Sequence, residues 1–174
     1  LRSLGINPYP AERFDVNATA ADINENYERD KTSYKSISIA GRLMTRRIMG
    51  NASFASIQDQ TGKLQIYIKR DEICPGEDKN LYNTVFKKLL DIGDIIGVTG
   101  YVFTTQTGET TLHVNSLKVL SKSLRPLPIV KADAEGNVFD AVTDPEFRYR
   151  QRYVDLIINP EVKQVFKQRS TIMT

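Results

Sequence analysis

The stretch SISIAGRLMTRRIMGNASFASIQDQTGKLQIYIKR, residues 36–70, decides the fold, because apolar residues recur in it at every second position. Ile37 and Ile39 alternate with polar partners at its start, and Leu64 and Ile66 do so near its end. A period of two is that of strands that bury one face. Two turn signals divide the stretch into three predicted strands: Met49-Gly50-Asn51 and Asp59-Gln60-Thr61-Gly62.

The next segment adds a helix and two more strands. Apolar spacings of three and four predict a helix over Asn80–Leu90, which Gly93 is placed to end. Ile95–Thr104 and Thr110–Leu120 are again typical of strands. Three strands, a helix and a hairpin form the element order of an OB-fold, a mainly β, five-stranded Greek-key barrel that commonly binds single-stranded nucleic acid. Three glycines within strands suit the coiling or bulges of a small closed barrel: Gly41, Gly97 and Gly100.

The patterns divide the chain into three segments. Residues 36–123 form the predicted OB-fold domain. Residues 1–35 are interpreted as an N-terminal extension and linker, with one short helix capped by Thr19. Residues 124–174 are interpreted as a linker and the truncated start of another domain. Two N-cap–proline signals each begin a helix there: Asp144-Pro145 and Asn159-Pro160.

The composition, 40% hydrophobic and 26% charged, is that of a globular protein. No apolar run approaches the length of a membrane span and no signal peptide is evident, so we expect no membrane partner. The single cysteine, Cys74, suits a reducing compartment, and we expect a cytoplasmic location. Because the chain begins with leucine and its last helix has no stop signal, we expect further residues on both sides.

The charge allows a small nucleic-acid site. The net charge is +3, and residues 36–123 carry 11 basic and 8 acidic side chains. A tight, sequence-independent grip on duplex DNA rests on many phosphate contacts. This balance therefore argues against such a grip and leaves room for a local site.

Candidate catalytic residues are scarce. His113 is the single histidine, and no second histidine or cysteine lies near enough in sequence to complete a metal site. We interpret it as an imidazole on a barrel face rather than as a base or ligand. Asp59, Asp91 and Asp94 suit the turns that hold them. The residues predict a binding module with no catalytic residue, no metal site and no cofactor of its own.

Binding candidates gather on the predicted outer face of the second and third strands. Phe54 lies among small residues, and Gln65 is out of phase with its apolar neighbours. Such a ring can stack on a base while the amide reads the edge of that base. Arg46 and Arg47, at the end of the first strand, are candidates for phosphate or base contacts. Glu109, at the tip between the fourth and fifth strands, can accept from base N–H groups.

Each of these residues also has a plainer interpretation. Phe54 suits a core position, and Gln65 suits an ordinary solvent-facing one. Arg46 and Arg47 suit solvated charges, and Glu109 suits a hairpin. Without a family, the functional and the plain interpretations of Phe54 and Gln65 stay about level.

The run AGRLMTRRIMGNASF, residues 40–54, closely resembles the anticodon-binding domain of class II lysyl-tRNA synthetases. The resemblance covers nearly the whole chain. It continues in five further stretches: Gly5–Pro10, Leu64–Ile68, Thr107–Glu109, Leu124–Pro128 and Arg148–Leu156. The stretch Lys131–Val142 is longer than the commonest bacterial form, and its role is left open.

The resemblance implies that Phe54 stacks on the central anticodon base and that Gln65 hydrogen-bonds its edge. It also implies that Arg47 lies beside that base and that Glu109 helps read a neighbouring anticodon position. The partner would be a lysine-specific tRNA. The whole enzyme would join lysine to this tRNA through an ATP-derived adenylate, with magnesium, as a homodimer. Its catalytic motifs would lie beyond Thr174, so this chain alone would be an inactive fragment that ends in the dimer interface.

Two other classes of protein stay open. One is a free-standing OB-fold module that binds single-stranded nucleic acid, and the other is a structural or assembly domain. The arginines near the C-terminus do not decide between them, because on a helix Arg148 and Arg152 share a face that Arg150 does not. We expect these arginines to form ion pairs at a domain joint or a subunit contact.

Overall fold

The computed structural model describes residues 1–128, 131–132, 138–139 and 144–173. The chain divides into two compact units, Leu1–Pro126 and Leu127–Thr174. The boundary near residue 126 lies close to the expected boundary after Ser123. The expected boundary at residue 35 does not coincide with a division between units, because residues 1–35 belong to the first unit.

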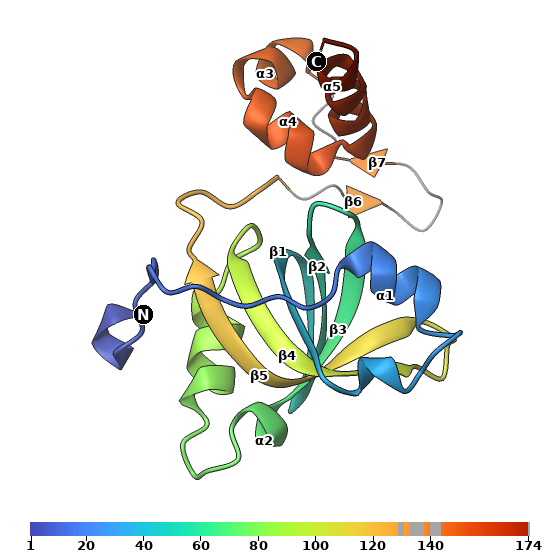
Figure 1. Ribbon diagram of the computed structural model, residues 1–174. Coiled ribbons are helices and arrows are strands. Elements are labelled where there is room, and N and C mark those ends of the chain that lie inside the picture. Colours follow the sequence, from blue (N-terminus) through green and yellow to red (C-terminus); the bar gives the residue numbers. More distant parts are fainter. Residues whose placement is uncertain (129–130, 133–137, 140–143, 174) are drawn as a thin grey trace. The chain divides into compact units, whose positions relative to one another are not determined.

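A closed barrel of five strands forms the centre of the first unit, in the order β1-β2-β3-β5-β4 (Figure 1). β3 and β5 pair in parallel, and the other neighbours pair antiparallel. This arrangement confirms the predicted mainly β fold. The strands are β1 Ile37–Met49, β2 Ala52–Gln58, β3 Lys63–Lys69, β4 Ile95–Thr104 and β5 Thr110–Ser121.

Burial alternates along the strands as the period of two predicts. In β3, Leu64, Ile66 and Ile68 are buried in the barrel, whereas Gln65 and Tyr67 between them are half-buried on the outer face. β2 alternates in the same way. Burial of these apolar side chains is the main force that holds the barrel closed.

Short helical segments surround the barrel: η1 Arg2–Leu4, α1 Ala20–Asn26, η2 Ser33–Lys35, α2 Arg70–Ile73 and η3 Leu81–Leu89. η3 lies between β3 and β4 where a helix is predicted, but it is a π-helix. The amide of Leu90 bonds the carbonyl of Val85, five residues back, at 2.9 Å. The wider turn buries Tyr82 and Phe86, whose rings stack at 5.8 Å, and leaves Leu81 half-buried.

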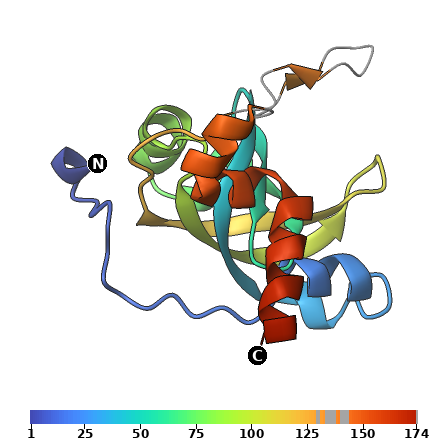
Figure 2. The same cartoon turned by 90° about the horizontal axis from the view of Figure 1, so that it is seen from above.

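The N-terminal segment packs on the barrel instead of forming a separate extension. Ala20 and Ile23 of α1 are fully buried, and α1 lies beside β3 (Figures 1 and 2). Thr19 caps α1, as predicted, by accepting from the amide of Asp22 at 3.3 Å. Asp59, in the turn between β2 and β3, accepts from the amide of Ala20 at 2.8 Å. The turn and the helix are thereby joined.

The second unit holds three helices in its described residues, α3 Pro145–Arg150, α4 Arg152–Ile158 and α5 Pro160–Met173, with the small strands β6 Lys131–Ala132 and β7 Val138–Phe139. Asp144 caps α3 as predicted. Arg148 and Arg152 both pair with the fully buried carboxylate of Asp155, and Arg150 pairs separately with Glu146. The expected ion pairing is present, but Arg148 and Arg150 lie on α3 and Arg152 lies on α4, because the helix breaks at Gln151. All three ion pairs lie within the unit.

Apart from β6 and β7, the stretch Lys131–Val142, whose role is open, lies outside the described residues. Among the described helices, none has the length and apolarity needed to cross a membrane.

Gly100 is the glycine on which the barrel depends most directly. A β-carbon there would meet the carbonyl oxygen of His113 at 1.8 Å, and the pairing of β4 with β5 shifts register between Thr99 and Gly100. We predict that Gly100→Ala lowers the free energy of unfolding by about 3 kcal/mol, because backbone must move to admit a methyl group. Urea unfolding measures this. Gly62→Ala, with nothing within 4 Å, should change it by less than about 1 kcal/mol; equal effects would contradict the prediction.

We expect Asp59 to make a pH-dependent contribution to the stability of the fold. Partial burial opposes its ionisation, but donors led by the amide of Ala20 and the hydroxyl of Thr61 outweigh it and hold the pKa of Asp59 below 3.8. Because the pKa of Asp59 is lower in the folded than in the unfolded state, the ionised carboxylate stabilises the fold at pH values above 3.8. This contribution is lost as the pH falls through the folded-state pKa. We expect Asp59→Ala to cost about 1–2 kcal/mol at neutral pH and progressively less in acid.

Urea unfolding of both proteins across this pH range measures the difference. Asp15→Ala is the control, because the side chain of Asp15 is exposed and forms a surface ion pair with Arg13. A cost of Asp59→Ala that stays constant as pH falls would show that its charge has no such role.

Candidate nucleic-acid interface

One row of side chains crosses all five strands on the outer face of the barrel. Each member is the direct register partner of the next, through pairs between β1 and β2, β2 and β3, β3 and β5, and β5 and β4. In spatial order the row is Arg47, Phe54, Tyr67, His113 and Tyr101. We call its four rings the aromatic row.

The rings of the aromatic row contact one another in sequence. The centroids of Phe54 and Tyr67 are 5.0 Å apart, and those of Tyr67 and His113 are 5.1 Å apart. His113 and Tyr101 stack at 4.7 Å with 29° between their planes. These distances are those of favourable ring pairs. An unbroken row of ring contacts therefore crosses this part of the outer face, where polar side chains are usual.

A polar row runs beside the aromatic row, two residues away along β1, β2, β3 and β5, and ends at Phe103 on β4. Thr45 and Ser56 share a hydrogen bond of 2.7 Å between their hydroxyls. Gln65 donates through Nε2 to Glu109 Oε2 at 2.7 Å and to Thr111 Oγ1 at 3.0 Å. Because Nε2 carries two hydrogens, both are used. Gln65 therefore offers its carbonyl oxygen, an acceptor, to a ligand.

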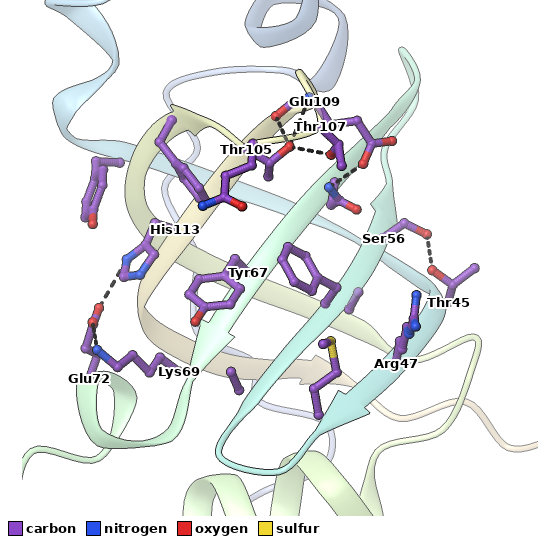
Figure 3. A pocket seen from close by; sticks show the side chains of 18 residues that line it. Thr45, Arg47, Ser56, Tyr67, Lys69, Glu72, Thr105, Thr107, Glu109 and His113 are labelled. Carbon is purple, nitrogen blue, oxygen red and sulfur yellow. Dashed lines mark hydrogen bonds and ion pairs between the residues drawn. The ribbon is translucent and has the colours of Figure 1, made fainter.

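The two rows line one pocket of about 1150 Å³. Figure 3 shows Arg47 on one side of it, His113, Lys69 and Glu72 on the other, and Glu109 at the tip between β4 and β5. Of the predicted site residues, Phe54, Gln65, Arg47 and Glu109 line this pocket.

Arg46 is the predicted site residue that the structure places elsewhere. Its guanidinium donates to the carbonyls of Phe86 and Leu90, the latter at 2.8 Å, and lies 5.8 Å from the centroid of the Phe86 ring. Adjacent residues of a strand point to opposite faces, so Arg46 and Arg47 cannot both face the pocket. Arg46 instead satisfies carbonyls at the end of η3.

Tyr67, Tyr101 and His113 were not predicted as site residues. The signal for Tyr67 was present, since it shares the phase of Gln65 in β3. Tyr101 and His113 join the site through the register of β4 and β5, which periodicity does not specify. His113 is an imidazole on a barrel face, as expected, and only 7% of it is exposed.

Charged side chains border the pocket on both sides. Arg47 is exposed beside Phe54, and Lys69 lies beyond Tyr67 on β3, with half of its side chain exposed. The carboxylate of Glu72, 3.2 Å away, raises the pKa of Lys69, which keeps the ammonium charged. The Oε2 atom of Glu72 also lies 3.1 Å from Nδ1 of His113, but the two atoms are not oriented for a hydrogen bond. Two cations around an aromatic surface suit a ligand that has both rings and phosphates.

Comparison with known proteins agrees with this geometry. Residues 37–120, which span the barrel, match the family described as OB-fold nucleic acid binding domain. The chain is 58% identical over 173 residues to lysine–tRNA ligase of Porphyromonas gingivalis, which covers 99% of the chain. Along nearly its whole length, the chain is closely similar to one part of the lysine–tRNA ligases. The lysine–tRNA ligases of Christiangramia forsetii and Azobacteroides pseudotrichonymphae are each 55% identical over 172 residues, again covering 99% of the chain. The chain spans 30%, 30% and 34% of the length of these three relatives, respectively.

The two adjacent arginines give a prediction that separates support from binding. Arg46→Ala should lower the free energy of unfolding by about 1–3 kcal/mol, because it removes charge-assisted hydrogen bonds to two carbonyls. Arg47→Ala should change it by less than about 0.5 kcal/mol, because Arg47 is exposed. Urea unfolding of both variants measures this. A larger loss from Arg47→Ala would contradict the assignment.

Proposed function

We propose that the pocket binds the anticodon loop of a lysine-specific tRNA and that it reads the central anticodon base. The observation that carries this proposal is the pairing of an accessible ring, Phe54, with an amide of fixed orientation, Gln65. A ring binds the face of an unpaired base, and an amide reads its edge. The names of the relatives, lysine–tRNA ligases, support tRNA as the class of ligand.

The orientation of Gln65 favours a base that presents an N–H group to its carbonyl oxygen. Both hydrogens of its Nε2 are donated to Glu109 and Thr111, so its carbonyl oxygen faces the ligand. A uridine on Phe54 can donate its N3–H to that oxygen. Cytidine has a bare nitrogen at the same position, which would place two acceptors together. The guanidinium of Arg47 then binds a base carbonyl or a phosphate on the other side of Phe54.

Glu109 has two proposed tasks at the tip between β4 and β5. It holds the amide of Gln65 through the 2.7 Å hydrogen bond. It also accepts from the N–H groups of a neighbouring anticodon base. Arg46 is left out of the proposed interface because its guanidinium is held by η3.

For the whole protein we propose a lysine–tRNA ligase that uses ATP and magnesium, forms a homodimer and acts in the cytoplasm. The names and close similarity of the relatives support this proposal. In the part of the chain that the structure describes, no group of three or more histidine, cysteine, aspartate or glutamate side chains could hold a metal ion. We assign the side chains that line the pocket to tRNA binding.

Titration with four RNA and DNA ligands tests the proposal. The chain should bind the lysine anticodon stem-loop more tightly than an unrelated stem-loop or oligo-dT, and should bind a stem-loop with central cytidine more weakly. Equal affinity for all ligands would favour a free-standing single-strand-binding module. Binding to none of them would favour a structural domain.

Phe54→Ala should weaken binding of the lysine stem-loop by about 1–3 kcal/mol, because a stacked base loses its ring partner. Fluorescence anisotropy measures the affinity, and urea unfolding measures the stability of the same variant. Phe166→Ala is the control, since Phe166 is an exposed ring of α5 in the other unit. Unchanged affinity together with lost stability would make Phe54 a support of the fold instead.

A further inference from the structure

The aromatic row is longer than one base requires. Phe54 and Tyr101 lie at its two ends, and the rings of Tyr67 and His113 fill the space between them. Three successive centroid distances of 5.0, 5.1 and 4.7 Å separate the two end rings. A base stacked on Phe54 therefore leaves the other end of the row uncovered.

Tyr101 presents an exposed ring at that end. It stacks on His113, and 40% of its surface is exposed. His113 is enclosed by Tyr67 and Phe103 as well, at 5.1 and 5.7 Å. An exposed tyrosine held in place on a buried ring is a prepared stacking surface, because little side-chain freedom is left to lose on binding.

The backbone next to Tyr101 is shaped to bring it there. The register of β4 and β5 shifts between Thr99 and Gly100, and the shift sets Tyr101 directly opposite His113. The carbonyl of His113 comes so close to Gly100 that a β-carbon would lie 1.8 Å from it. Bulges of this kind redirect side chains beside binding sites.

An amide, a ring and a cation follow one another along β3 in an order that suits the base edges, base faces and phosphates of a nucleic-acid strand. On β3, Gln65, Tyr67 and Lys69 share the outer face in succession. The edge-reading amide thus lies on one side of the aromatic row and the cation on the other. A strand laid along the row would turn base edges toward Gln65 and phosphates toward Lys69.

We propose that Tyr101 is a second base-stacking position, which binds another unpaired nucleotide of the same RNA loop. The inference rests on the proposed function of the Phe54 end. Stacking on a ring tolerates every base, so Tyr101 adds affinity for an unpaired, splayed nucleotide and leaves the reading of base identity to Gln65.

A double-mutant cycle between protein rings and RNA bases tests this. The affinity of the chain, of Tyr101→Ala and of Phe54→Ala is measured for the lysine anticodon stem-loop and for versions with one loop base removed at a time. Tyr101→Ala should weaken binding about 5- to 100-fold. Tyr101→Phe keeps the ring and should bind within about twofold of the unaltered chain.

The decisive result is the loop position at which removal of the base abolishes the affinity loss caused by each substitution. We expect the effect of Tyr101→Ala to vanish at one loop position and that of Phe54→Ala at a different one, because coupling energy marks direct contact. Overturning results are unchanged affinity of Tyr101→Ala, or coupling of both rings to a single base. Both would leave the function at Phe54 intact. Failure of the unaltered chain to prefer its stem-loop would instead remove the proposed function itself.

Discussion

The pairing register of the closed barrel determines where every side chain of the candidate site lies. Direct pairs across β1, β2, β3, β5 and β4 place Arg47, three aromatic side chains and His113 in one line. A slip of one residue in any strand would turn its member of the line into the barrel. The apolar side chains that prevent such slips are those of the interior, such as Ile66 and Leu112. The core thus specifies the surface.

Helical elements hold the turn between β1 and β2 in place through hydrogen bonds. This turn lies next to Arg47 and Phe54. Lys87 of η3 donates to the carbonyl of Gly50 at 2.7 Å, and Arg70 of α2 donates to Oδ1 of Asn51 at 2.9 Å. The same helix η3 receives the guanidinium of Arg46 at its end. The turn next to Arg47 is therefore fixed before any ligand binds, which lowers the entropic cost of binding.

The sequence predicted the parts of the site that depend on phase within one strand. Phe54 and Gln65 lie outside the barrel because their apolar neighbours on β2 and β3 point inward. The contact of Gln65 with Glu109, and the stacking of Tyr101 on His113, depend on pairing between strands far apart in sequence. The partners of Arg46 at the end of η3 could not be predicted from local pattern either, since they lie about 40 residues away in sequence. Local pattern gives the face of a residue, and tertiary pairing gives its neighbours.

The central claim is that one outer face of the barrel binds the RNA. Amide chemical-shift mapping by NMR, with the lysine anticodon stem-loop added to the labelled chain, tests it most directly. We expect the largest shifts along β2, β3 and the β4–β5 tip, around Phe54, Gln65 and Glu109, and small shifts in α5. Shifts concentrated in α3 to α5, with the aromatic row unaffected, would contradict it.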